Sequence, residues 1–207
     1  MTAARTKNKE KTALREDILD AARELFVSQG YENVSMRKIA ERIGYSPTTI
    51  YLYFKDKSEL LREICETTFA KLGDEIIESQ HAGGSTIDIL RRGMIAYIEF
   101  GLSNPHHYDV VFISPGEKFI GPNDFSYEGS MGQQAFDLMA SSVTDCMAAG
   151  TIRDGDVATI AQTLWAGIHG ATSLLITHEG FPWVDRKKLT DSVVDTLIAG
   201  ITVPNGL

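Results

Sequence analysis

Cysteine is scarce in this chain of 207 residues, which contains only Cys65 and Cys146. The two are far apart and neither belongs to a Cys-x-x-Cys pair, so the sequence has no disulfide framework. We expect two buried helix cysteines, with a redox-sensing pair as the alternative. The N-terminus is polar and lacks the apolar run of a secretory signal, so we expect a reducing, cytoplasmic setting.

Enzyme motifs are missing as well. The sequence has no nucleophile elbow, phosphate loop or dinucleotide fingerprint, and Gly83-Gly84 lacks the strand context that a phosphate loop needs. His106, His107 and Asp109 are clustered, but adjacent histidines on a helix point apart, unlike metal ligands. We therefore expect no metal, no cofactor and no enzymatic activity. An enzyme acting through this histidine cluster is the alternative from another class.

Positive charge is in the minority, with 20 Lys and Arg against 28 Asp and Glu, which gives a net charge of −8. The imbalance is uneven along the chain. Residues 1–60 carry 11 basic and 9 acidic side chains, whereas residues 61–207 carry 9 and 19. The first part is thus mildly basic, and any binding of a polyanion should depend on placed contacts more than on long-range attraction.

Charge is absent altogether from Val157 to Thr177, a run of 21 residues. This length is sufficient to span a bilayer. However, the run contains polar residues such as Thr159, Gln162 and His169, which are costly to transfer into lipid. We therefore expect a helix that is buried on most sides, and no membrane span.

The stretch after residue 34 contains the capping and helix-ending residues expected of two short helices around a tight turn. Ser35 can cap the first helix, because its hydroxyl accepts a hydrogen bond from a first-turn amide. Gly44 can adopt the left-handed backbone that ends a helix sharply. Ser46 can cap a second helix, from about Pro47 to Phe54, whose first residue needs no N–H. The sequence therefore predicts a helix-turn-helix.

The second helix of this pair has an inner and an outer face. Ile50 and Phe54 lie four residues apart and should face inward. The outward positions carry hydroxyl, methyl-bearing and phenol side chains: Pro47, Thr48, Thr49, Tyr51, Leu52 and Tyr53. Such groups can contact base edges, thymine methyls and phosphates. Positive charge flanks them at Arg37, Lys38, Lys55 and Lys57.

These residues carry a resemblance to a known family. The matching positions are Ala21-Ala22, Leu25-Phe26, Gly30-Tyr31, Ile39-Ala40, Gly44, Tyr51, Phe54, Lys57 and Leu60-Leu61. In this order and spacing they resemble the DNA-binding domain of the TetR family of transcriptional regulators, over roughly residues 12–72. An ordinary corner of a helical bundle with exposed threonines and tyrosines is the alternative.

The resemblance implies a set of DNA-binding residues: Ser35, Arg37, Lys38, Pro47, Thr48, Thr49, Tyr51, Tyr53 and Lys57. Arg37, Thr48, Thr49 and Tyr51 should face bases or nearby phosphates, and Ser35, Lys38, Tyr53 and Lys57 should hold the DNA backbone. Leu52 is apolar where family members often carry a polar residue. It can contact a thymine methyl or simply pack.

Apolar periodicity predicts helices along the whole chain. Their expected ranges are 13–29, 35–43, 47–54, 57–79, 86–102, 105–113, 130–149, 157–177 and 186–199, with a loop over 114–130. We expect residues 1–12 to be a basic, disordered tail, either solvated or reaching a minor groove. Residues 12–72 would form the helix-turn-helix domain and residues 73–207 a larger helical domain for ligand binding and dimerisation.

Trp165, His169 and Gly170 form a W-x3-H-G pattern that resembles a motif in the C-terminal domain of many TetR-like regulators. Small residues four apart allow close helix contact, which suits a four-helix dimer interface. The candidate interface residues are Trp165, Ala166, Gly167, His169, Gly170, Ala171, Leu174, Val193 and Leu197.

By analogy with the family, a small molecule fits between helices of the second domain. The candidate lining is apolar and aromatic: Phe69, Leu72, Met94, Tyr97, Ile98, Tyr108, Phe112, Phe136, Met139 and Trp165. Each of these residues is an equally good core residue. An apolar or amphipathic effector is expected in preference to a sugar.

The sequence therefore predicts an all-α, two-domain, homodimeric regulator. We expect a repressor that binds a double-stranded, pseudo-palindromic operator and is released by a small effector. A DNA-binding protein without any small-molecule ligand is the alternative.

Overall fold

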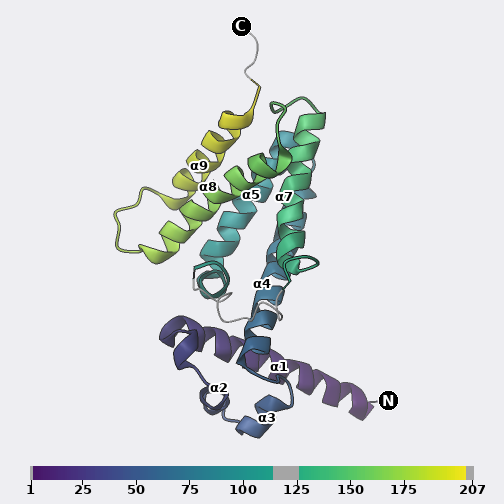
Figure 1. Ribbon diagram of the computed structural model, residues 1–207, viewed down its shortest axis with the longest axis vertical. Coiled ribbons are helices and arrows are strands. Elements are labelled where there is room, and N and C mark those ends of the chain that lie inside the picture. The colour runs from purple at the N-terminus through teal and green to yellow at the C-terminus, as the bar shows by residue number, and fades with distance from the viewer. Residues whose placement is uncertain (1, 114–125, 204–207) are drawn as a thin grey trace. The chain divides into compact units, whose positions relative to one another are not determined.

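All the helices that apolar periodicity predicts are present in the computed structural model, which describes residues 2–113 and 126–203, with side chains from residue 9 onward (Figure 1). Every regular element in these ranges is helical, which confirms the all-α prediction. The elements are α1 (Thr2–Gln29), the 3-10 turn η1 (Tyr31–Asn33), α2 (Met36–Arg42), α3 (Pro47–Tyr51), α4 (Lys57–Gln80), α5 (Thr86–Ser103), α6 (Pro105–Tyr108), the π-helical turn η2 (Asp109–Ile113), α7 (Met131–Ala148), α8 (Val157–Thr177) and α9 (Arg186–Ile201).

The chain forms two compact units, and α4 begins in one and ends in the other. The first unit comprises the chain up to Thr68 and the segment that begins at His106, and the second comprises the remainder. The sequence placed a boundary near residue 72 and left η2 in the second part. Val110 of η2 instead joins the apolar core of the first unit, where only 2% of its surface is exposed.

The core of the first unit joins one apolar face from each of its helices. Its fully buried members are Ile18 and Ala22 of α1, Ile39 and Ala40 of α2, Ile50 of α3, and Leu60 and Ile64 of α4. Burying each isoleucine or leucine among them stabilises the unit by roughly 1.5–3 kcal/mol, before entropy is counted. The core thereby fixes which face of α3 remains outside.

The expected disordered tail is a helix instead, because α1 already begins at Thr2. Alanine, lysine, arginine and glutamate, which are frequent before residue 16, are good helix formers. Extending an existing helix also avoids the cost of nucleation. The sequence interpretation weighed polarity and charge, which do not oppose a helix that continues from a packed one.

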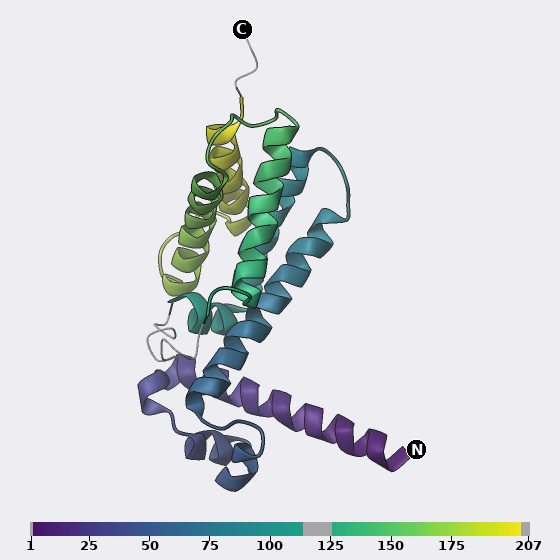
Figure 2. The same cartoon turned by 45° about the vertical axis from the view of Figure 1, so that its right-hand side comes forward.

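In the second unit, α5 contacts α7, α8 and α9, while α8 contacts α7 and α9. Figures 1 and 2 both show α8 and α9 side by side. Arg91 of α5 forms ion pairs with two residues of α9. Its guanidinium lies 3.1 Å from the Asp191 carboxylate and 2.7 Å from the Asp195 carboxylate. Among the helices of residues 2–113 and 126–203, none combines the length and apolar character needed to cross a bilayer.

The C-terminal ends of α3 and α9 differ from the predicted ones by two residues or more. α3 ends at Tyr51 instead of Phe54, because the N–H groups of Leu52 and Tyr53 bond to carbonyls three residues back and tighten the turn. α9 continues to Ile201, and Thr202 is extended and forms a bridge with Ile152. Most of the loop expected over 114–130 lies outside the described residues.

Candidate nucleic-acid interface

The turn between α2 and α3 is fixed by backbone geometry. The Ser35 hydroxyl accepts a hydrogen bond from the Lys38 N–H at 3.2 Å, which caps α2 as predicted. Gly44 has a φ of 74°, a left-handed conformation that residues with a side chain rarely adopt. The Tyr45 N–H then closes the turn on the Ala40 carbonyl at 2.9 Å. The direction in which α3 leaves α2 is therefore defined.

The α3 segment is anchored at both ends of its inner face. Ile50 and Phe54 are 0% and 1% exposed, so they hold the helix on the core. At the N-terminus, the Ser46 hydroxyl accepts a hydrogen bond from the Thr49 N–H at 3.2 Å and also lies 2.9 Å from the Thr49 hydroxyl. Pro47 occupies the first helical position. A five-residue helix becomes stable through these contacts, since its length alone would not suffice.

The outer face of α3 is uncharged and partly apolar. Pro47 and Thr48 are exposed, Tyr51 is 54% exposed and Leu52 is 76% exposed. Thr49 and Tyr53 are only half-buried, so they too have accessible surface. These residues form a surface through which α3 can enter the major groove of a duplex.

Tyr45 was not among the predicted DNA-binding residues. It is 47% exposed directly after Gly44, one residue before the cap of α3. Its position in a turn gave no helical register, so apolar periodicity could not assign it to a face. The available indication was that Tyr45 lies outside the apolar spacing of both neighbouring helices, which leaves its side chain without a predicted place in the core.

Two of the predicted phosphate-binding cations also serve the protein itself. The Lys38 ammonium donates hydrogen bonds to the Gln29 side chain at 3.0 Å and to the Asn33 carbonyl at 2.9 Å. The Arg37 guanidinium pairs with Glu41 one turn away at 2.9 Å. Both side chains are exposed, and exposed ion pairs are weak enough for a phosphate to compete with them.

Lys57, at the start of α4, holds the turn at η1. Its ammonium donates hydrogen bonds to the carbonyls of Tyr31 at 2.6 Å and Val34 at 2.8 Å, and lies 4.0 Å from the centre of the Tyr31 ring. Partial burial lowers the pKa of Lys57, and burial likewise raises the pKa of the Tyr31 phenol. An ammonium has three N–H donors, so two bonds to carbonyls leave room for a third partner.

The N-terminus of α4 differs in detail from a capping box. Asp56 accepts a hydrogen bond from the Glu59 N–H at 2.8 Å, as expected of an N-cap. The Glu59 carboxylate, however, accepts from the Lys55 N–H at 2.5 Å, one residue before the cap. In a capping box the Glu59 carboxylate would accept from the N–H of the N-cap residue, Asp56, whereas here it accepts from the residue before it.

The candidate ligand lining is divided between the two units. Tyr108 and Phe112 belong to the first, and the other eight residues belong to the second. Leu72, Met94 and Ile98 are at most 2% exposed, as core residues would be. The structure therefore assigns at least these three to packing, whatever else they do.

Three polar side chains are joined by hydrogen bonds among the mainly apolar candidate residues of the ligand lining. The Trp165 indole N–H donates to the Tyr97 hydroxyl at 3.1 Å, and this hydroxyl lies 3.4 Å from Nδ1 of His169. Burial lowers the pKa of His169, which favours its neutral form. The W-x3-H residues thus share one hydroxyl partner on α5.

The candidate dimer residues have mixed exposure. Trp165, Ala166 and Leu174 are exposed, and the remaining six are half-buried. One of the small residues has an evident use within the chain. A Cβ at Gly167 would lie 2.6 Å from Cδ1 of Leu197, whereas a Cβ at Gly170 would have no neighbour within 4 Å. Gly167 therefore permits close packing of α8 on α9, and the space beside Gly170 is open.

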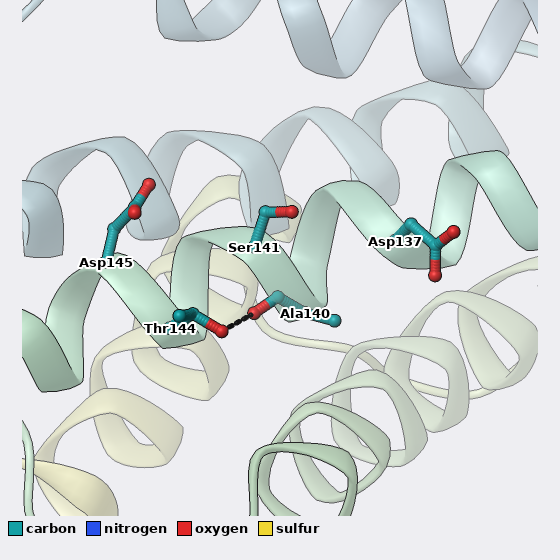
Figure 3. Close-up of a pocket in the computed structure, with 5 residues that line it drawn as sticks. All are labelled: Asp137, Ala140, Ser141, Thr144 and Asp145. Atoms are coloured by element: carbon teal, nitrogen blue, oxygen red, sulfur yellow. Dashed lines mark hydrogen bonds between the residues drawn. The ribbon is translucent and has the colours of Figure 1, made fainter.

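Figure 3 shows a pocket on α7 whose lining includes none of the predicted lining residues. Asp137, Ala140, Ser141, Thr144 and Asp145 line it, all from one helix. Its lining is mixed polar and apolar and it is open to solvent, unlike the enclosed, mainly apolar pocket typical of an effector site. In the described ranges, no three His, Cys, Asp or Glu side chains are placed to hold a metal ion.

Two family models match the chain. One, described as "Bacterial regulatory proteins, tetR family", matches residues 18–64, and another, described as "Tetracyclin repressor-like, C-terminal domain", matches residues 90–199. The second model alone covers more than half of the chain. The first contains α2 and α3 entirely, so it coincides with the surface described above.

Curated relatives match over about half of their own length. The chain is 36% identical over 97 residues to HTH-type transcriptional regulator AcrR of Shigella flexneri, covering 46% of this chain and 45% of that protein. It is 26% identical over 102 residues to HTH-type transcriptional repressor AcnR of Corynebacterium diphtheriae, covering 49% and 47%.

Solved structures match over nearly the whole chain. A bacterial regulatory protein in the tetR family from Rhodococcus RHA1 superposes with a TM-score of 0.79 at 18% identity, covering 92% of this chain and 98% of that one. The ketosteroid transcriptional regulator KstR2 of Mycobacterium tuberculosis gives a TM-score of 0.71 at 18% identity, covering 91% and 95%. At this identity the likeness shows the fold alone.

Proposed function

The chain belongs to the TetR family of bacterial regulatory proteins, and we propose that it is a transcriptional repressor that binds a pseudo-palindromic operator as a homodimer and is released by a small, mainly apolar molecule. The observation that carries this proposal is the outward face of α3, which the core holds in place while Thr48, Tyr51 and Leu52 remain exposed.

DNA contact is assigned first to this face. Thr48, Thr49 and Tyr51 would meet bases or nearby phosphates, with Pro47 beside them. The backbone contacts would come from Ser35, Arg37, Lys38, Tyr53 and Lys57. The hydrogen bonds of Ser35, Arg37, Lys38 and Lys57 within the chain support a preorganised surface, because side chains that are already ordered lose less entropy on binding.

Dimer formation is assigned to α8 and α9. The 21 residues of α8 carry no charge, yet Trp165, Ala166 and Leu174 are exposed. An uncharged, partly apolar helix face is typical of a subunit interface. A two-fold dimer would present two α3 helices to two half-sites, and this explains the expectation of a pseudo-palindromic operator.

Effector response is assigned to the second unit. The polar group of Tyr97, Trp165 and His169 among apolar neighbours resembles the few placed polar groups of ligand sites. The effector must bind the DNA-free state more tightly than the DNA-bound state, since equal affinity for both would leave the equilibrium between the two states unchanged. This role requires no enzymatic step, and we place the protein in the cytoplasm with the DNA.

A DNA-binding protein without an effector is the second candidate. The complete burial of Leu72, Met94 and Ile98 favours it, because residues so well packed leave no space for a ligand beside them. Thermal unfolding of the purified protein with a panel of apolar and amphipathic compounds separates the two candidates. A bound effector would raise the Tm in a concentration-dependent way.

The main test is binding of the purified protein to the intergenic DNA upstream of its own gene, beside a scrambled duplex, at two salt concentrations. We expect nanomolar, sequence-selective binding with dimer stoichiometry. A double variant, Thr48→Ala with Tyr51→Ala, should bind more weakly and with reduced selectivity, whereas Ile77→Ala, an exposed change in the second unit, should behave like the parent protein. Equal, weak binding to both duplexes and to duplexes selected from random sequence would refute the proposal.

A further inference from the structure

The surface assigned to the major groove lacks the side chains that most often identify bases. From Ser46 to Phe54 the chain carries no Arg, Lys, Asn, Gln, Asp or Glu. Arginine and lysine identify guanine through two acceptors, and asparagine and glutamine identify adenine in the same bidentate manner. α3 therefore cannot use bidentate hydrogen bonds to discriminate bases.

The most exposed large hydrophobic side chain of this surface is a leucine. Leu52 has 76% of its surface exposed, more than Tyr51 at 54% or Tyr45 at 47%. It follows the last residue of α3, and its φ and ψ of −75° and −17° continue the helical direction. The core does not need it, because Ile50 and Phe54 anchor this segment. A single exposed leucine is common, but this one lies on the surface assigned to DNA.

The hydroxyls beside it are less available than the sequence suggests. The hydroxyl of Thr49 lies 2.9 Å from that of Ser46, whose oxygen also accepts the Thr49 N–H. A hydroxyl held in a cap can contact a base only if it leaves or shares this bond. Pro47, the threonine Cγ2 atoms and Leu52 thus give this surface a large apolar part, beside the exposed Thr48 and Tyr51.

In the major groove, the thymine C5-methyl is the apolar group that distinguishes one base from the other three. We infer that this protein recognises its operator through thymine methyl groups, with Leu52 as the main specificity-determining residue. The inference rests on the proposed function and adds the chemistry of base recognition to it. Thymines should therefore occupy the base positions that Leu52 contacts in each half-site.

Deoxyuridine provides a direct test, because it pairs like thymidine and keeps the O4 acceptor but lacks the methyl group. The half-site is first selected by the purified protein from a randomised duplex and then remade with deoxyuridine at single thymine positions. Loss of one contacted methyl should weaken binding about fourfold, and loss of the symmetric pair about fifteenfold. Thymines outside the contacted positions serve as internal controls.

Protein variants connect the effect to Leu52. In Leu52→Ala, deoxyuridine at the same position should weaken binding less than about twofold, because the partner of the methyl is gone. The matched control Ile77→Ala removes an exposed apolar side chain from the second unit and should retain the full fourfold loss. Thermal unfolding confirms that both variants are folded.

The outcomes separate the inference from the proposed function. Selective binding that tolerates deoxyuridine at every thymine would overturn the inference and leave the regulator intact; Arg37 reading a guanine would produce this result. A deoxyuridine loss that persists unchanged in Leu52→Ala would overturn the role of Leu52. Failure to select any sequence would overturn the proposed function itself.

Discussion

Gly167 and Gly170 lie one turn apart on α8, and the same substitution should have opposite effects at the two positions. Replacing glycine by alanine within a helix is favourable by about 1 kcal/mol, because alanine loses less conformational freedom. Within a single chain, Gly170→Ala should gain this amount, since its new methyl would meet nothing within 4 Å. Gly167→Ala should not, since its methyl would lie 2.6 Å and 2.8 Å from the two Cδ atoms of Leu197.

The free-energy cost of Gly167→Ala comes from the movement of Leu197 that the new methyl would require. Leu197 is half-buried and its Cγ would also lie only 3.2 Å from the new methyl, so the whole isobutyl group must turn. Overpacking of this kind costs about 1–3 kcal/mol. After the gain from helix propensity, Gly167→Ala should be destabilised by up to about 2 kcal/mol. The two variants should thus differ by about 1–3 kcal/mol.

Thermal unfolding at one fixed protein concentration measures this difference, at about 2–4 °C for each kcal/mol in a chain of this size. Adding Leu197→Ala to each variant completes the test. Its cost should be smaller beside Gly167→Ala than beside Gly170→Ala, because the clash is relieved. Equal Tm shifts for the two glycine variants would refute the packing of Leu197 on Gly167. Dilution then tests the dimer, which Gly170→Ala should weaken if a partner helix packs there.

Two further predictions concern charged groups. Lys57→Met should lower the free energy of unfolding by about 1 kcal/mol, because two hydrogen bonds to carbonyls are lost from a partly exposed, screened site. If the third N–H also holds a phosphate, the salt slope of DNA binding should fall by about one, and an unchanged slope would contradict that role. Hydrogen bonds from the Thr159 hydroxyl and N–H lower the pKa of Asp156 in the folded chain. The contribution of Asp156 to stability is therefore fully present above the ordinary carboxyl pKa, and it is lost as the pH falls through the lowered pKa of the folded chain. Asp156→Asn should therefore unfold at a lower temperature than the parent protein at pH 7, with the gap closing below about pH 4 in calorimetry; a gap that persists at low pH would exclude a titrating cap.

Local chemistry was enough to predict most of the fold from the sequence. Ser35 and Ser46 were expected to cap helices, and each accepts a hydrogen bond from an amide three residues on. Gly44 was expected to be left-handed and is. These features depend only on neighbours along the chain, so no knowledge of the packing was needed.

Predictions failed where the answer depended on distant residues. Val110 belongs to the core of the first unit, but its own segment gives no indication of which unit it packs against. α3 ends after Tyr51, although apolar spacing continues to Phe54, because apolar spacing does not distinguish a helix from a tight turn that buries the same residues. The DNA-binding residues themselves remain predictions, to which exposure added Tyr45.

The cations show best what the structure adds to a sequence interpretation. Counting charge gave the first part a net of about +2 and suggested four flanking cations for phosphates. In the folded chain, Lys38 and Lys57 bind the carbonyls of Asn33, Tyr31 and Val34, and Arg37 pairs with Glu41. A phosphate contact of these three cations must then share or replace an existing bond, so its net gain is smaller than that of a free ammonium. The electrostatic part of DNA binding should therefore be weak, and more of the affinity should come from the apolar and hydroxyl surface of α3.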